Sequence, residues 1–155
     1  MRVVLQRVHH AEVQVDEQVV GACGRGLLLL VGVGPGDTEK DAKWLAKKIA
    51  GLRIFPDAQD RMNLSILDVE GSALSISQFT LYGDCRKGRR PSFIGAAKPA
   101  LAEPLWEKFC DLLAAEGVPT ARGRFGADMQ ISALADGPVT LVLESPCSSE
   151  PNKQP

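Results

Sequence analysis

The 155-residue sequence lacks a long hydrophobic run and an excess of either charge. Its densest apolar stretch, Leu27–Val33, is far shorter than the roughly 20 residues that a membrane-spanning helix requires. The first residues show neither the long apolar region nor the small-residue cleavage site of a secretory signal, so we expect a cytoplasmic protein. A net charge of -1 argues against a protein that coats nucleic acid non-specifically.

The sequence also lacks the residue pattern of a metal site. Its four cysteines, at positions 23, 85, 110 and 147, contain no Cys-x-x-Cys pair, and its only two histidines, His9 and His10, are adjacent. We therefore expect no metal, no other cofactor and no disulfide framework. The cysteines are predicted to be small, mostly buried apolar residues.

Length and composition are those of one folded domain. The apolar fraction is 45% and the charged fraction 24%, both ordinary for a globular protein. Residues 1–144 contain no internal repeat and no linker, and we interpret them as a single domain. Residues 145–155 are rich in proline and serine and lack large apolar side chains, which predicts a disordered tail.

Hydrophobic periodicity predicts an α+β protein with antiparallel or mixed sheets. One helix is expected from Asp37 or Thr38 to Gly51, and a second, with Pro99 near its first turn, to about Glu116. Residues 58–63 are expected to form a loop. The predicted strands are Met1–Val8, Glu12–Val15, Val19–Cys23, Gly26–Val33, Arg53–Pro56, Ser72–Tyr82, Thr120–Arg124, Met129–Leu134 and Val139–Leu143.

A glycine-rich segment, Gly32–Asp37, lies between a predicted strand and a predicted helix, where a dinucleotide fingerprint would lie. Its third glycine comes one position too early, and Asp37 occupies the place of that glycine. A carboxylate there would repel a pyrophosphate, so we interpret the segment as a strand-to-helix turn.

Four cations, Arg86, Lys87, Arg89 and Arg90, fall within five residues of a predicted loop. Such a cluster usually remains solvated. Phosphate contact also needs this concentration of charge, because each neutralised phosphate releases counterions. Both interpretations, a solvated loop and a nucleic-acid contact, stay open on composition alone.

Two other segments are candidates for chemistry. Ser77–Leu81 brings two hydroxyls and an amide together after a predicted strand. A serine nucleophile there would need a general base, but no Gly-x-Ser-x-Gly elbow is present and nothing places a histidine beside Ser77. Asp136-Gly137-Pro138 is a turn signal, or else a rigid backbone reader in which glycine admits a close ligand and proline fixes φ.

Taken together, these segments resemble the D-aminoacyl-tRNA deacylase family from Met1 to about Glu144. The pair Ser-Gln-Phe-Thr and Gly-Pro-Val-Thr, in this order and about sixty residues apart, is the specific signature. The segments that carry the resemblance are Leu5-Gln6-Arg7-Val8, Arg53-Ile54-Phe55, Met62-Asn63-Leu64, Ser77-Gln78-Phe79-Thr80-Leu81, Arg90-Pro91-Ser92-Phe93, Gly123-Arg124-Phe125-Gly126-Ala127-Asp128-Met129 and Asp136-Gly137-Pro138-Val139-Thr140.

The resemblance implies a homodimer with a layered β-β-α fold and two main helices. It implies hydrolysis of the ester between a D-amino acid, or mischarged glycine, and the 3′-terminal adenosine of tRNA. The RNA 2′-OH and backbone N–H groups around Phe79 and Thr80 would assist, and L-aminoacyl-tRNA would be rejected by clash with backbone. The expected partner is thus aminoacylated tRNA, contacted at its terminal adenosine and acceptor stem, with no membrane and no metal.

The same resemblance assigns roles to residues. Ser77, Gln78, Phe79 and Thr80 would form the catalytic segment, with Thr80 as the candidate catalytic side chain. Gly137 and Pro138, joined by a cis bond, would enter the partner subunit's pocket, held by Arg7, and Met129 would line the pocket. The basic loop of Arg86, Lys87, Arg89 and Arg90 would help to hold the acceptor stem.

One position departs from the family pattern, since Ala135 stands where the family usually has asparagine before Asp-Gly-Pro. The loss of that amide puts the rigidity of the motif in doubt. Two alternatives also stay open: a protein that binds the tRNA 3′ end without turnover, and an acyl hydrolase that uses Ser77 as its nucleophile.

Overall fold

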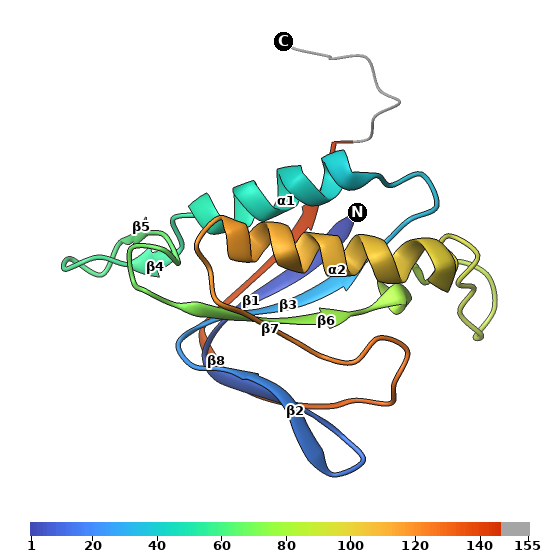
Figure 1. Cartoon of the computed structure of the whole chain (residues 1–155), viewed down its shortest axis with the longest axis horizontal. Coiled ribbons are helices and arrows are strands. Elements are labelled where there is room, and N and C mark those ends of the chain that lie inside the picture. The colour runs from blue at the N-terminus through green and yellow to red at the C-terminus, as the bar shows by residue number, and fades with distance from the viewer. Residues whose placement is uncertain (147–155) are drawn as a thin grey trace.

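The computed structural model describes residues 1–146, and Figure 1 shows the arrangement of its elements. No helix within these residues is long and apolar enough to cross a membrane. In chain order the elements are β1 (Arg2–Val15), β2 (Gln18–Cys23), β3 (Gly26–Gly32), α1 (Glu39–Gly51), β4 (Phe55–Pro56), β5 (Met62–Leu64), β6 (Ser72–Ser77), the 3₁₀ helix η1 (Phe79–Tyr82), α2 (Pro99–Ala115), β7 (Thr120–Arg122) and β8 (Gln130–Glu144).

The main sheet is mixed, and β1 is its organising strand. β1 runs antiparallel to β2, β3 and β8, whereas β3, β6 and β7 are parallel to one another. The first half of β1, Arg2–Val8, pairs with β3, and its second half, from Ala11, pairs with β2. β8 follows the other edge of β1 over almost its whole length. The strands β4 and β5 form a separate small sheet.

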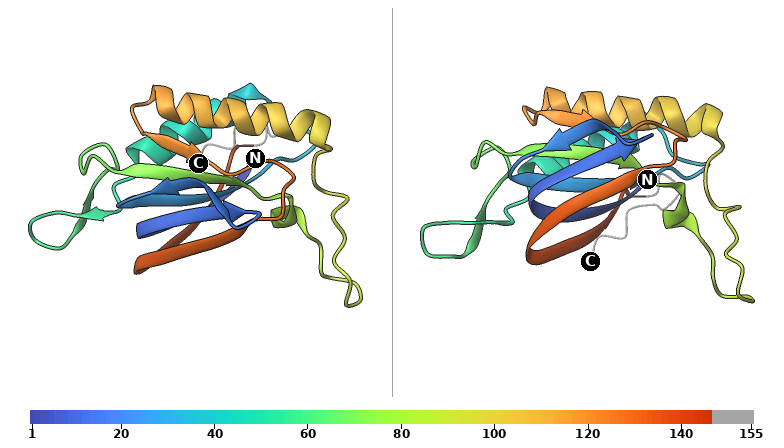
Figure 2. Two further views of the ribbon diagram at one scale, coloured as in Figure 1. Left: turned by 60° about the horizontal axis from the view of Figure 1, so that its bottom comes forward. Right: turned by 90° about the horizontal axis from the view of Figure 1, so that it is seen from below.

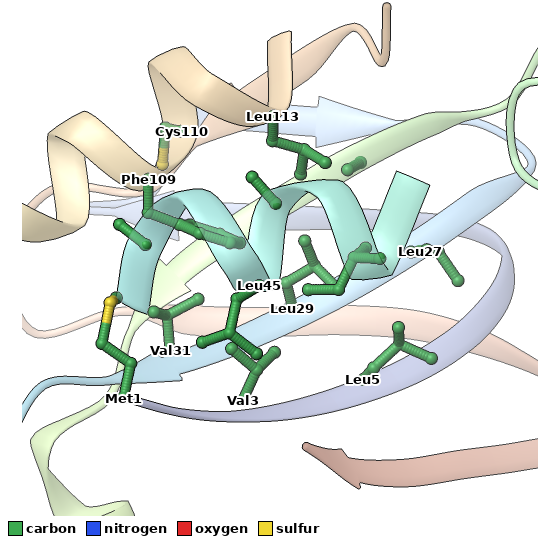
Figure 3. Packing of buried hydrophobic residues seen from close by; sticks show 14 of the residues in the cluster. Met1, Val3, Leu5, Leu27, Leu29, Val31, Leu45, Phe109, Cys110 and Leu113 are labelled. Atoms are coloured by element: carbon green, nitrogen blue, oxygen red, sulfur yellow. The ribbon is translucent and has the colours of Figure 1, made fainter. Parts of the chain in front are cut away.

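Two hydrophobic cores define three layers. The larger core lies between the two helices and one face of the sheet, where Leu45 of α1 and Phe109 of α2 pack toward Val3, Leu29 and Val31 (Figure 3). Figure 2 shows both helices on that one side. The smaller core fills the opposite face and consists of Val8, Ala11, Val13, Cys23, Leu28, Leu74 and Ile76.

The second β layer forms because β2 folds across toward the far edge of the sheet. Gly21 of β2 permits this approach, since a Cβ there would come within 2.5 Å of the carbonyl oxygen of Arg122 in β7. The sheet therefore curls into a partial barrel that the helices cover on one face. The predicted α+β class with β-β-α layers and two main helices is confirmed.

Both predicted helices are present at the expected places. α1 begins after Thr38, whose backbone N–H donates to the Asp41 carboxylate at 2.8 Å, and it ends at Gly51. α2 starts at Pro99, where a missing N–H costs nothing. The predicted turn between β3 and α1 is also confirmed, because the Asp37 carboxylate accepts the backbone N–H of Gly34 at 2.6 Å.

Several strand boundaries were predicted wrongly. The strand expected over Ser72–Tyr82 ends at Ser77, because the chain crosses over Gly32 and coils into η1. Gly32 leaves room for this, since a Cβ there would lie 3.1 Å from the carbonyl oxygen of Gln78. Residues 58–63 are not entirely loop, because Met62–Leu64 forms β5.

Two pairs of predicted strands are single strands. Met1–Val8 and Glu12–Val15 belong to β1, and Met129–Leu134 and Val139–Leu143 belong to β8. The two long strands pair with each other, and the intervening residues are absorbed as register shifts on either side of Val8 rather than ending the strands. Asp136-Gly137-Pro138 therefore lies inside β8.

The cysteines follow the prediction in part. Cys23 and Cys110 are buried, and burial raises the pKa of both thiols, that of Cys110 to about 11. Cys85 is exposed, so its predicted burial was wrong, because it begins a loop that projects from the domain. Cys147 and the rest of the predicted tail beyond residue 146 lie outside the described residues.

Candidate functional site

A cavity of about 600 Å³ lies at the C-terminal ends of β3 and β6. Its walls come from four parts of the chain: the ends of these two strands, the loop before α2, the first two turns of α2, and the segment that leads into β8. A volume of this size is typical of a small-molecule or cofactor-sized site. The topology places it where two parallel strands end and a short 3₁₀ helix begins.

The polar end of the cavity is formed by Ser77, Gln78 and Phe79. The backbone N–H of Gln78 donates to the carbonyl of Val31 at 2.8 Å, which fastens this segment to β3. Phe79 and Thr80 open the 3₁₀ helix, so their N–H groups precede the first intrahelical donor and have no acceptor within the helix. Two adjacent backbone donors without an acceptor in the helix therefore lie beside the cavity, which Phe79 lines.

Thr80 adjoins the cavity without lining it. Its side chain is exposed, and its Oγ1 accepts a hydrogen bond from Nε2 of Gln78. Because the oxygen acts as acceptor to Gln78, the hydroxyl proton of Thr80 remains free to be donated to another group. The pair is thus an oriented hydroxyl beside the two free backbone N–H groups.

The floor of the cavity is aromatic. The buried Trp106 donates its Nε1–H to Oγ of Ser75 at 3.0 Å, and the Ser75 side chain is fully buried. This hydrogen bond fixes the indole, whose ring centroid lies 6.0 Å from that of Phe125. At the rim, Phe93 meets Phe79 edge to face with centroids 5.1 Å apart.

Met129 completes one wall, and Gly123 makes room for it. A Cβ on Gly123 would come within 2.8 Å of the Met129 sulfur and 3.1 Å of Cδ1 of Ile76. A larger residue at this position would require the Met129 side chain to shift from its place against the end of β6. The Gly-Arg-Phe-Gly-Ala-Asp-Met segment therefore contributes both an aromatic ring and a thioether to the site.

Among the residues that line the cavity, Lys98 alone carries a charge, and none is a histidine or a carboxylic acid. His9 lies elsewhere, with its Nε2 3.6 Å from Asp136. Ser77 is therefore not placed beside a histidine. Within residues 1–146 no group of three or more His, Cys, Asp or Glu side chains is arranged to hold a metal.

Gly137 and Pro138 are joined by a cis peptide bond, and Gly137 has φ of +120°. Arg7 packs against them, since a Cβ on Gly137 would lie 3.3 Å from Nη2 of Arg7. The guanidinium is itself buried, donates to the carbonyl of Ile54 at 2.6 Å and pairs with Asp136 at 2.9 Å. Nε approaches the carboxylate without aiming its N–H at it, so this contact is an ion pair and not a hydrogen bond.

These three residues lie away from the cavity of their own chain. Arg7 pairs with Leu27 at the beginning of β3, whereas Val31 at the end of β3 borders the cavity. The structure thus brings Ser77, Gln78, Phe79 and Met129 together, with Thr80 adjacent, and leaves the Gly137–Pro138 motif at the other end of the strand.

The basic loop is closed by an isolated bridge between Asp84 and Ser92. At the start of this loop, Arg86 donates two hydrogen bonds to the Asp84 carboxylate, at 2.9 and 2.7 Å. These bonds lower the pKa of Asp84 and raise the pKa of Arg86. Lys87, Arg89 and Arg90 are exposed and form no ion pair within the described part of the chain. The loop therefore offers three uncommitted cations, and Arg86 is used to shape it.

Part of the site was not predicted from the sequence. Trp106 was not singled out, although Ala102 and Trp106 follow a helical i, i+4 spacing that differs from the core stripe through Leu105 and Phe109. This spacing does not by itself separate a cavity residue from a core residue, because Ala102 and Trp106 belong to the main core and also line the cavity. Lys98 and Phe125 were also not identified as lining residues.

Comparisons with known proteins show the family to which the chain belongs. The model of the family described as D-Tyr-tRNA(Tyr) deacylase matches residues 4–144. The chain belongs to this family. A D-aminoacyl-tRNA deacylase of Exiguobacterium sp. is 60% identical over 144 residues, which cover 93% of this chain and 98% of the relative. A D-aminoacyl-tRNA deacylase of Geobacter sulfurreducens is 56% identical over 145 residues, covering 94% and 95%.

A solved structure of the same fold gives the spatial comparison. The structure described as c-Myc DNA Unwinding Element Binding Protein matches with a TM-score of 0.87 at 37% identity. The match covers 94% of this chain and 99% of that chain, so the family fold extends over nearly all of the described residues. The resemblance inferred from the sequence motifs is thereby confirmed.

Proposed function

We propose that this chain hydrolyses the ester that joins a D-amino acid, or a mischarged glycine, to the 3′-terminal adenosine of tRNA. The observation that carries the proposal is the cavity in which Ser77, Gln78 and Phe79 meet Met129 over an aromatic floor. Membership of the deacylase family, and the names of relatives that match nearly the whole chain, support it.

The cavity suits a terminal nucleoside. Trp106 and Phe125 form an apolar floor on which a base can stack, and such stacking tolerates an unpaired strand end. The ester would then lie at the polar end, beside the first residues of η1. We assign the substrate's 3′ end to this cavity for that reason.

The chemistry proposed for the site needs few protein side chains. The free N–H groups of Phe79 and Thr80 are placed to stabilise the oxyanion that forms when water attacks the ester carbonyl. Preorganised donors of this kind are worth roughly 3–4 kcal/mol each. The Thr80 hydroxyl, oriented by Gln78, orients water or the ribose 2′-OH, and the 2′-OH supplies the proton transfers that no lining side chain provides.

Rejection of L-aminoacyl-tRNA is assigned to the backbone of Gly137 and Pro138. The motif lies at the opposite end of β3 from its own cavity, so a second copy of the chain would have to present it. A filter made of backbone excludes the wrong hand by clash and makes no demand on side-chain identity, so many D-amino acids can pass. Arg7 takes the role of holding the motif through its buried contacts with Ile54 and Asp136.

A homodimer follows from the same reasoning, and the surface of β8 supports it. Ile131, Leu134 and Val142 on this strand are exposed by 38%, 52% and 65%. β8 pairs with β1 along one edge, and within the described residues no strand covers its other edge. A long apolar edge strand is a liability in a monomer, so we propose that a second copy covers it.

The experiment that tests the function compares D-Tyr-tRNA and L-Tyr-tRNA as substrates of the purified protein, with a chelator present. We expect the D ester to be lost quickly and the L ester to be spared. Equal loss of both would contradict the backbone filter. Binding of charged tRNA without loss of either ester would replace the proposal by the non-catalytic alternative.

The basic loop gives a separate prediction about tRNA affinity. The double substitution Arg89→Ala with Arg90→Ala should weaken tRNA binding and reduce the slope of log K against log salt by roughly 1–2, because up to two phosphate contacts are lost. The measurement is a salt titration of tRNA binding. Arg61→Ala, at another exposed loop, is the control, and unchanged affinity and slope in the double variant would rule out the contact.

A further inference from the structure

The 3₁₀ helix η1 carries the backbone donors of the proposed site, yet the core does not anchor it. Within Phe79–Tyr82 no side chain is fully buried, and Phe79 is 57% exposed. A single turn with poor intrinsic hydrogen bonding needs outside contacts to keep one conformation. Besides the packing of Phe79 on Phe93, those contacts come from Arg2 and from the surroundings of Tyr82.

Arg2, the first residue of β1, reaches the end of the turn. Its Nη1 donates to the carbonyl oxygen of Leu81 at 2.6 Å, and its guanidinium carbon lies 4.9 Å from the ring centroid of Tyr82. Its Nε donates to the Glu144 carboxylate at 2.6 Å. Because Arg2 is paired with Gly32 of β3 and Glu144 of β8, the sheet holds its backbone on both sides.

Tyr82 fixes the same turn from the other side. Its ring lies on the glycines at the end of β3, since a Cβ on Gly32 or on Gly34 would come within 3.1 Å or 3.2 Å of ring carbons. Its hydroxyl lies 3.4 Å from the Asp37 carboxylate. Burial, and then the nearby charge of Asp37, raise the pKa of Tyr82, so the phenol stays protonated and donates.

We propose that Arg2 and Tyr82 form a clamp that positions the Phe79–Thr80 segment for ester hydrolysis. The assignment rests on the proposed function of the site. Neither residue lines the cavity, so both act through the backbone of η1 and are positioning residues. The clamp matters for the reaction because a displacement of about 1 Å in a catalytic group costs on the order of 100-fold in rate.

The test is the variant Arg2→Gln, with Arg25→Gln as its matched control. Arg25 also stacks on an aromatic ring, 5.7 Å from the centroid of Phe55, but it lies away from the cavity. We expect Arg2→Gln to lower kcat roughly 10-fold or more on D-Tyr-tRNA with KM changed less than about twofold, and Arg25→Gln to leave both unchanged. An unchanged kcat in Arg2→Gln would overturn the clamp.

Two further variants separate positioning from general stability. Arg2→Lys keeps a cation that can still donate to the carbonyl of Leu81, so it should recover part of the kcat that Arg2→Gln loses. Tyr82→Leu should also lower kcat, and combining it with Arg2→Gln should cost less than the product of the single effects, because both remove one clamp. Independent, multiplying effects would contradict the clamp.

Amide hydrogen exchange tests the clamp independently of enzymatic activity. In Arg2→Gln the amides of Leu81 and Gly83, which donate within the turn, should exchange faster, while those of β3 remain protected. Unchanged exchange at these two amides would overturn the clamp even if no deacylation is seen. If the unsubstituted enzyme fails to cleave D-Tyr-tRNA, the proposed function fails; if it cleaves and Arg2→Gln cleaves equally, the clamp alone fails.

Discussion

Replacing Gly137 with alanine should lower kcat/KM for D-aminoacyl-tRNA by roughly 100-fold or more. Gly137 has φ of +120°, which an alanine adopts only with strain, and its Cβ would come within 2.8 Å of the backbone nitrogen of Val139. The backbone of the motif must therefore shift. Gly36→Ala is the control, because a Cβ there meets nothing within 4 Å, and its kinetics should match those of the unsubstituted protein.

If two copies of the chain pair as proposed, mixed dimers of two variants test which cavity the Gly137 motif serves. Ala127→Phe places a large ring at the cavity rim and should inactivate the cavity that carries it. Random mixing of Gly137→Ala and Ala127→Phe chains should restore up to about a quarter of the full activity, since half the dimers then hold one intact cavity facing one intact motif. No recovery, with both homodimers inactive, would show that the motif serves its own chain.

The second large effect is expected from the substrate. A D-aminoacyl-tRNA that ends in 2′-deoxyadenosine should be deacylated roughly 100-fold to 10,000-fold more slowly, which is the usual contribution of a positioned acid or base. The reason is that no histidine or carboxylic acid lines the cavity, so the proposed mechanism assigns the proton transfers to the ribose hydroxyl. Single-turnover deacylation of the two substrates measures the ratio.

The variant Ser77→Ala, measured beside the 2′-deoxy substrate, separates the two proposed mechanisms. If the RNA hydroxyl carries the proton transfers, this variant should lose less than about tenfold in kcat, whereas removal of a true nucleophile costs several orders of magnitude. A large loss with Ser77→Ala and a small one with the deoxy substrate would favour the serine hydrolase alternative. Because His9 lies beside Asp136 and away from Ser77, we expect a small loss with Ser77→Ala and a large loss with the deoxy substrate.

Much of the fold could be predicted because its signals are local. Helical spacing and capping residues located α1 and α2, and the continuous apolar run located β3. The end of β6 could not be predicted, because the side chains of Ser72–Tyr82 alternate beyond Ser77. The strand ends because the chain at Gln78 crosses closely over Gly32, and this is a contact between residues far apart in the sequence.

The candidate site was only partly visible in the sequence. Motif resemblance pointed to Ser77–Thr80 and to Gly137–Pro138, but no pattern indicates that the two lie at opposite ends of β3. That separation depends on the register of β1 against its neighbours. The aromatic floor was hidden for a similar reason, since Trp106 follows helical spacing and differs from a core residue only in what it faces.

The length of β1 between Arg2 and Arg7 fixes the spacing between two contacts at opposite ends of β3. Its first residue, Arg2, contacts the turn beside the cavity of its own chain, and Arg7, five positions later, contacts the motif at the far end of β3. Because strand pairing fixes side chains by parity, deleting one residue between them would turn one of the two arginines to the opposite face. Val4 and Gln6, which lie outside the core, should therefore tolerate changes of side chain far better than this stretch tolerates changes of length.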